Sequence, residues 1–146
     1  MAAVSSALKL NQKYVEAIRL QPMRYYDVDK RFIDFVREYL DKSHRSDRYK
    51  RMYLNTIDHI LSFCDLNDIR ELYTDSIGME FCENFVYYLR SEKGLMQNTV
   101  KGHLERLQAM LQKAMLYGYY VDNTYKEVSV QEEEVVAIFL SMTEIT

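Results

Sequence analysis

Apolar residues recur at alternating steps of four and three between residues 100 and 114 of this 146-residue chain. The positions concerned are Val100, Leu104, Leu107, Leu111 and Ala114. This spacing puts all five side chains on one face of an α-helix, whereas a strand needs a spacing of two. We therefore expect a helix that starts at Asn98 or Thr99, ends at Gly118 and buries one face in a core.

The rest of the chain also favours helices. Similar apolar spacing predicts further helices over residues 30–42, 47–64 and 75–91. Asp29 and Ser46 are candidate N-caps for the first two, and Gly94 suits a C-terminal cap for the third. The sequence has one proline and four glycines, and 48% of its residues are apolar, enough to fill one core. The predicted fold is all-α, a compact bundle of four to five helices.

The chain also carries indications of its cellular setting. Cys64 and Cys82 lie inside apolar helical patterns, where a cysteine behaves as a small hydrophobic residue, so we expect free thiols and a reducing compartment. The apolar runs fall far short of the roughly 20 residues that cross a bilayer, and the N-terminus lacks the features of a signal peptide. The sequence predicts a cytoplasmic protein with no membrane partner.

Charge is unevenly distributed along the chain, although the net charge is only −3. Residues 42–51 hold five lysines and arginines against one acid, a net charge of +4. Residues 93–113 have a net charge of +3, and residues 122–146 have a net charge of −5. Two basic segments and an acidic tail are therefore separated in the sequence, and the basic segments are candidates for a contact with phosphates.

A catalytic site is not expected in this chain. His103-x-x-Arg106 followed by Tyr119 and Tyr120 resembles parts of an enzyme that cleaves DNA through a tyrosine. The neighbouring leucines, however, should place His103 and Arg106 on the flanks of their helix, with no second arginine to complete a phosphate clamp. A phenol with a pKa near 10 also needs cationic neighbours before it can attack phosphorus. We interpret the His-Arg pair as incidental and the tyrosines as non-catalytic.

Metal and cofactor sites are not expected either. The three histidines and two cysteines show none of the local pairings typical of zinc sites. Residues 132–134 are three glutamates, which suit a solvated helix start better than a metal cage. The sequence has no glycine-rich phosphate loop. No cofactor and no small-molecule substrate is predicted.

The two basic segments carry the candidate binding residues. In the first segment these are Lys42, His44, Arg45, Arg48, Lys50 and Arg51, and at the start of the later helix they are Gln97, Asn98, Thr99 and Lys101. Lysines and arginines can follow a phosphate backbone, and the free N–H groups of a helix start suit a phosphate as well. Residue types alone leave the alternative open that these side chains only cap and solvate two helices.

Several motifs together resemble a known family. They are "FIDFVREYL", "SDRYKRMY", "FVYYLRSEKGLMQNTVKGHLERLQAMLQKAMLYGYYVDN" and "EEVVAIFLSMTEI", in that order. Their succession over residues 30–146 resembles the core-binding, SAM-like domain of tyrosine recombinases (phage-type integrases), particularly those of mobile elements in Bacteroides-like bacteria. The matching positions of the later helix are Gly94, Asn98, Thr99, Val100, Leu104, Leu107, Leu111, Ala114, Gly118 and Asn123. The sequence departs from the family at Met96 and at Thr124, where the family usually has proline.

The resemblance implies a function in DNA integration and recombination. It implies a helical module that forms half of a C-shaped clamp around duplex DNA, beside other recombinase protomers, with its second and fourth helices toward the duplex. It also implies that the catalytic Arg, His-x-x-Arg and Tyr belong to a separate domain. The segment "FLSMTEI" resembles the opening of that domain. We therefore expect an arm or short helix over residues 1–29, the core-binding domain over 30–124, and a linker into the absent catalytic domain over 125–146.

A helical protein-interaction module that binds no DNA is the alternative. Exposed aromatic residues would mark its partner surface, and Tyr25, Tyr26, Tyr119 and Tyr120 are the candidates. The two hypotheses differ in where charge should lie. If residues 42–51 and the start of the fourth helix lay on opposite sides of the fold, the clamp would be excluded.

Overall fold

The structure is a computed structural model, and it describes residues 31–133. The elements follow in the order α4 (Phe32–Lys42), α5 (Asp47–Leu66), η3 (Thr74–Ser76), α6 (Met79–Ser91), α7 (Gln97–Leu116) and η4 (Asn123–Glu127). Within this range the only β-type pairing is an isolated bridge between Arg31 and Tyr73. The prediction of an all-α bundle is confirmed.

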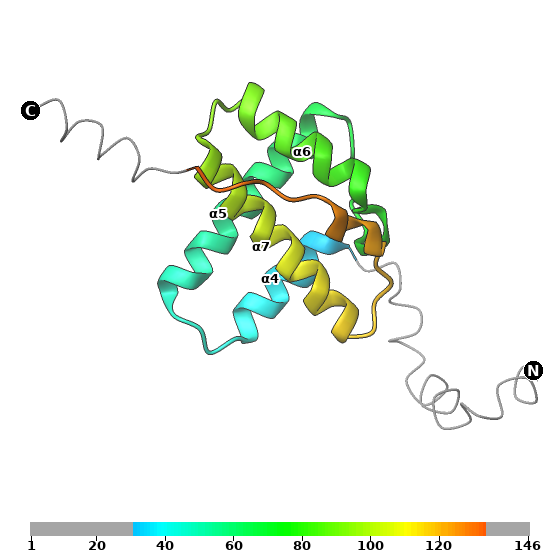
Figure 1. The fold of residues 1–146 in the computed structure, drawn as a ribbon. Helices are drawn as coiled ribbons and strands as arrows, with labels where there is room; N and C mark the ends of the chain where they lie inside the picture. The colour runs from blue at the N-terminus through cyan, green and yellow to red at the C-terminus, as the bar shows by residue number, and fades with distance from the viewer. Residues whose placement is uncertain (1–30, 134–146) are drawn as a thin grey trace, which may run out of the picture.

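Helix α7 forms the centre of the bundle (Figure 1). It crosses α5, while α4 lies beside the second half of α7 and α6 packs along the opposite side. The predicted stripe is confirmed, because its five members are at most 1% exposed, as is Met110 on the same helix. Phe32, Ile60 and Phe85 bring the other three helices into the same core.

The helix ends are set partly by residues that the sequence indicates. The Ser46 hydroxyl accepts a hydrogen bond from the Tyr49 N–H at 3.2 Å, so the predicted N-cap of α5 is confirmed. Gly94 has φ of +61° after α6, the left-handed conformation that glycine adopts without strain. The N-cap predicted for the first helix, Asp29, is wrong, because α4 begins at Phe32 with Arg31 at the N-cap position; Asp29 itself lies outside the described residues. Within residues 31–133 no helix is both long and apolar enough to cross a membrane.

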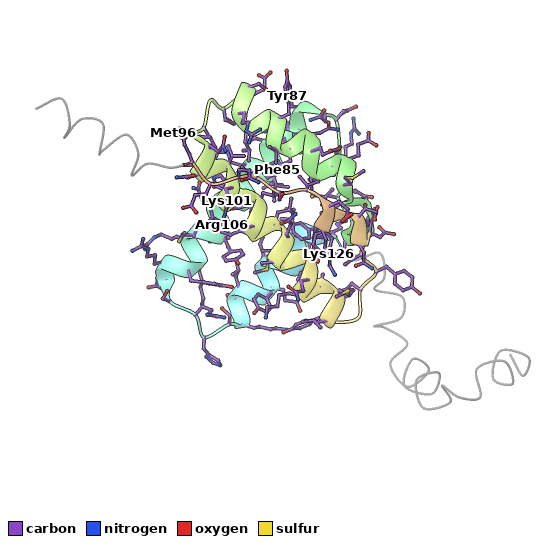
Figure 2. All side chains as sticks on the ribbon, viewed as in Figure 1. Phe85, Tyr87, Met96, Lys101, Arg106 and Lys126 are labelled. Atoms are coloured by element: carbon purple, nitrogen blue, oxygen red, sulfur yellow. The ribbon has the colours of Figure 1, made fainter. Side chains whose placement is uncertain are left out.

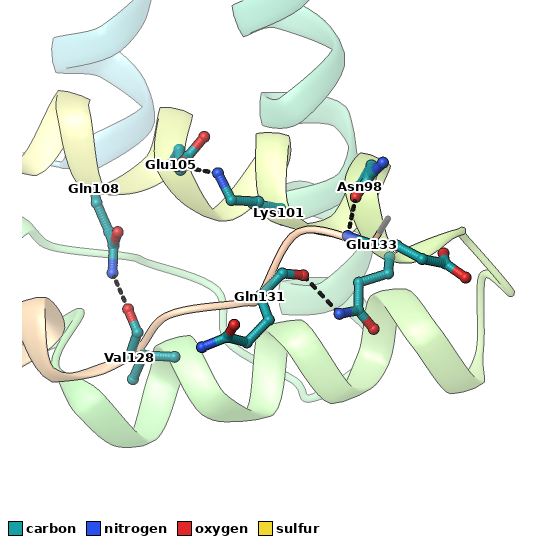
Figure 3. Close-up of polar contacts among 8 residues, drawn as sticks. Asn98, Lys101, Glu105, Gln108, Val128, Gln131 and Glu133 are labelled. Carbon is teal, nitrogen blue, oxygen red and sulfur yellow. Dashed lines mark hydrogen bonds and ion pairs between the residues drawn. The ribbon is translucent and has the colours of Figure 1, made fainter. Parts of the chain in front are cut away.

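Residues 128–133, which we call the strap, run along α7 after η4 (Figure 3). Gln108 Nε2 donates to the carbonyl oxygens of Tyr125 and Val128, both at 2.8 Å. Tyr125 and Val130 are themselves buried in the core. Part of the segment expected as a linker is thus packed against the bundle. Its role in joining a further domain stays a prediction.

Candidate nucleic-acid interface

The first candidate cluster lies at the end of α4, in the following loop and on the first turns of α5. It consists of Lys42, His44, Arg45, Arg48, Lys50 and Arg51, and we call it the α5 basic cluster. Lys50 is half-buried and the other five residues are exposed. Because Ser46 caps α5 inside this cluster, the start of the helix that carries Arg48, Lys50 and Arg51 is fixed.

The charges of the α5 basic cluster are mostly uncompensated. Lys42 forms an ion pair with Glu38 at 3.1 Å. For the cluster's three arginines and Lys50, no carboxylate oxygen of residues 31–133 lies within 4.0 Å. The Arg45 guanidinium lies 4.8 Å from the centre of the Tyr49 ring. Arg48 and Arg51 border a shallow hollow on α5, whose other lining residues are Met52, Leu54, Asn55 and Asp58. The cluster is therefore a local positive surface on a chain of negative net charge.

The second candidate group, at the start of α7, is already engaged within the protein. Gln97 Nε2 donates to the Gln131 carbonyl oxygen at 2.6 Å, and the Glu133 N–H donates to Asn98 Oδ1 at 2.8 Å (Figure 3). Lys101 forms an ion pair with Glu105 at 2.8 Å, which raises the pKa of its ammonium group. Thr99 is exposed. Three of the four predicted residues thus take part in intramolecular contacts, and two of them hold the strap.

The two candidate groups do not lie on opposite sides of the view. The start of α5 and the start of α7 both lie at the left of the fold in Figure 1. In Figure 2 Lys101 and Arg106 lie on this side, whereas Lys126 lies on the right. In this view the two groups are therefore not on opposite sides of the fold, the arrangement that would have excluded a clamp.

A buried polar junction joins α5 to α7, and it corrects the expectation for His103 and Arg106. His103 is 1% exposed, not on a flank. Thr56 Oγ1 lies 2.8 Å from His103 Nδ1 and accepts a hydrogen bond from Arg106 Nε at 2.7 Å. Arg106 Nη2 lies 3.3 Å from His103 Nδ1. The pair has a structural role: α5 crosses α7 at this point, and the Thr56 hydroxyl is a polar partner for the buried His103 and the half-buried Arg106.

Burial keeps the His103 imidazole neutral. Desolvation, the positive charge of Arg106 and the nearby His59 lower the pKa of His103 to about 4. The His59 and His103 rings lie 4.6 Å apart, edge to face. Since Nδ1 faces an arginine N–H, which can only donate, Nδ1 is the acceptor and the ring proton resides on Nε2. We name Thr56, His103 and Arg106 the α5–α7 junction.

The tyrosines near the end of α7 are packing residues or exposed side chains. The Tyr119 ring lies 5.6 Å from that of Phe35, edge to face, while Tyr120 is 59% exposed. Phe35, Tyr39, Tyr117 and Tyr119 line a hollow of about 380 Å³, and Lys42, His44 and Arg45 of the α5 basic cluster line it as well. Tyr25 and Tyr26, also named as possible partner contacts, lie outside the described residues.

The cysteines have no reactive environment. Cys64 and Cys82 are buried free thiols, and burial raises their pKa values to about 11 and about 12. The prediction of free thiols is confirmed. Among residues 31–133 no three histidine, cysteine or acidic side chains are grouped as a metal site would need.

Comparison with known proteins agrees with this architecture. The family model described as the phage integrase SAM-like domain matches residues 31–132, nearly the whole described part of the chain. No curated protein and no solved structure gave a match. The matched family is the SAM-like part of integrases and not their catalytic domain. Since the match covers more than half of the chain, the chain belongs to the phage integrase SAM-like domain family.

Proposed function

We propose that this chain is the DNA-binding, core-binding part of a tyrosine site-specific recombinase, and that it holds duplex DNA through the α5 basic cluster. The observation that carries the proposal is the uncompensated charge of Arg45, Arg48, Lys50 and Arg51 on a helix start fixed by its own cap. Binding of lysine and arginine side chains to DNA phosphates is favourable because it releases counterions that are condensed on the DNA.

The start of α7 contributes less in this proposal than its sequence implies. Gln97 and Asn98 already bond to the strap, and Lys101 shares its charge with Glu105. Thr99, exposed on the first turn, remains a candidate for a phosphate contact. Because Glu132 and Glu133 follow Gln131 at this helix start, their negative charge opposes a close approach of DNA there.

Binding of the 146-residue chain to a fluorescent duplex, followed by anisotropy, tests the proposal. With about four phosphate contacts, affinity should fall about 100-fold between about 50 and 200 mM salt. The double variant Arg48→Gln/Arg51→Gln should weaken binding. It should also reduce by about 2 the steepness with which the logarithm of the affinity falls with the logarithm of the salt concentration, which we call the salt slope.

The matched control is Arg70→Gln/Arg90→Gln, which removes the same charge from exposed positions after α5 and on α6. It should leave the salt slope unchanged. Equal losses in the two double variants, or no binding by the wild-type chain at low salt, would refute the proposal.

The parent protein, in this proposal, is a recombinase that cuts and rejoins DNA during integration of a mobile element, in the cytoplasm and beside other protomers. The support is the family membership together with "FLSMTEI", residues 139–145, which resembles the opening of a catalytic domain. The downstream reading frame tests it. That frame must encode an Arg, a His-x-x-Arg and a Tyr.

A protein-interaction module is the second candidate function, and the aromatic hollow between α4 and the end of α7 is the observation that favours it. If this module is the function, substitution of Tyr117, which lines the hollow and is exposed, should abolish a partner complex, and the chain should not bind DNA. DNA binding that depends on Arg48 and Arg51 would decide against this alternative.

A further inference from the structure

Among the described residues, Arg106 holds a positive charge at the crossing of α5 and α7 and has no ion-pair partner. Its side chain is half-buried, and its hydrogen-bond partners are the neutral Thr56 hydroxyl and the neutral His103 ring. Within residues 31–133 no carboxylate oxygen lies within 4.0 Å of the guanidinium, and the adjacent Glu105 is paired with Lys101. An arginine remains protonated even when burial lowers its pKa. A partly desolvated charge of this kind is costly unless an anion approaches it.

Two neutral partners orient the guanidinium, and they use only part of its hydrogen-bonding capacity. Thr56 takes the Nε hydrogen and His103 takes one Nη2 hydrogen, which leaves three of the five N–H groups that an arginine carries. Gly102 lies beneath the outer edge of the guanidinium. A Cβ there would lie 3.3 Å from Nη1 and 3.4 Å from Nη2. A side chain at residue 102 would therefore crowd the Arg106 guanidinium.

A continuous row of side chains connects Arg106 with the α5 basic cluster. Arg45 lies over Tyr49, and the Tyr49 and Tyr53 rings lie 4.7 Å apart. The next turn of the same helix carries Thr56, which binds Arg106. Tyr53 is half-buried and lies three residues before Thr56 on the same helix. A strand of phosphates that meets the α5 basic cluster can therefore continue to Arg106.

We infer that Arg106 binds a backbone phosphate of DNA and that Thr56 and His103 are positioning residues that aim its guanidinium. This inference rests on the proposed function and names a contact that the sequence pattern did not suggest. A guanidinium suits this task because its planar fork matches two phosphate oxygens at once, which an ammonium cannot do.

The test uses the full chain, a fluorescent duplex and variants whose folding is followed by circular dichroism. Arg106→Gln should weaken DNA binding about 10-fold near 100 mM salt and reduce the salt slope by about 1. Arg106→Lys should keep the slope but bind more weakly than wild type, because it keeps the charge and loses the fork. Lys126→Gln, the charge-matched control on η4, should match the wild type.

Positioning by Thr56 has its own test. Thr56→Val removes the hydroxyl at nearly constant shape and should weaken DNA binding, while Thr56→Ser should restore it. A purely structural role would lower the melting temperature without changing the affinity of the folded protein for DNA, and that result would overturn the positioning role.

A measurement on the wild-type protein covers the case in which Arg106→Gln does not fold. The ¹⁵N resonance of Arg106 Nε should shift on addition of duplex DNA and shift much less with inorganic phosphate at equal phosphate concentration. An equal shift with both would assign the site to free phosphate and overturn the DNA contact, as would no shift with either.

The outcomes separate the two claims. If the wild type binds DNA, the Arg48/Arg51 variant loses binding and Arg106→Gln binds like Lys126→Gln, the phosphate contact at Arg106 is wrong and the proposed function stands. If the wild-type chain does not bind DNA at low salt, the proposed function itself is wrong and the Arg106 contact is overturned with it.

Discussion

His103 illustrates what single residues of this sequence reveal and what they hide. A histidine beside two leucines of an amphipathic stripe is expected on the flank of the helix, yet His103 is buried against α5. The reason is Thr56, 47 residues earlier, which supplies a polar partner where the helices cross. Ser46 was predictable because its cap bond is local, whereas the environment of His103 depends on a contact between distant segments.

Stability should therefore depend on the protonation of His103. Its pKa falls from 6.5 to about 4 on folding, so below pH 6.5 the unfolded chain binds a proton that the folded protein excludes. The stabilisation is complete above pH 6.5 and is lost as the pH falls toward 4. Between pH 7 and 5 the free energy of unfolding should decrease by about 2 kcal/mol on account of this residue.

Urea unfolding at several pH values checks this prediction. His59 also has a lowered pKa, through burial and the charge of Lys93, and adds to the trend in the same direction. The variant His103→Gln cannot titrate and should show a clearly flatter dependence between pH 7 and 5. The same slope in the variant and the wild type would show that His103 is not buried in its neutral form.

Among the elements, helices were predictable and their ends only in part. The second helix was expected over 47–64 and covers Asp47–Leu66, because its cap and its stripe are both local. The third was expected from residue 75, but α6 begins at Met79. Thr124 accepts a hydrogen bond from the Met79 N–H at 2.9 Å and so supplies the helix start with an acceptor from 45 residues away. No local pattern contains that information.

The sequence did not predict the packing of the strap. Residues 125–133, which hold the end of η4 and the strap, were expected to be part of a linker because they are polar and acidic. Instead, Gln108 donates hydrogen bonds to two of their carbonyl groups, and Val130 is buried. Gln108→Ala should lower the free energy of unfolding by about 1 to 3 kcal/mol, because the Tyr125 and Val128 carbonyls lose their donor.

Gln112→Ala is the matched control, one turn later on the same helix and exposed. It should change stability by less than about 0.5 kcal/mol. Thermal unfolding of the two variants provides the comparison. Equal effects would show that the two bonds from Gln108 do not hold the strap.

At the scale of the whole molecule, the fold class, the family and the basic segment 42–51 followed from the sequence, although the net charge is −3. The charge pattern along the chain also gave the candidates for DNA binding. It could not show that Gln97 and Asn98 are used by the strap, or that Arg106 continues the row that starts at Arg45. Those arrangements arise from the crossing of α5 and α7, which depends on packing between distant segments.

Binding of DNA at the α5 side of the bundle is the central claim, and backbone amide NMR with added duplex tests it most directly. At low salt, the account predicts shifts at residues 44–51 and around Arg106, with little change on the outer face of α6 at Glu83, Tyr87 and Arg90, which are exposed. Shifts concentrated on α6, or unchanged spectra with excess duplex, would contradict it.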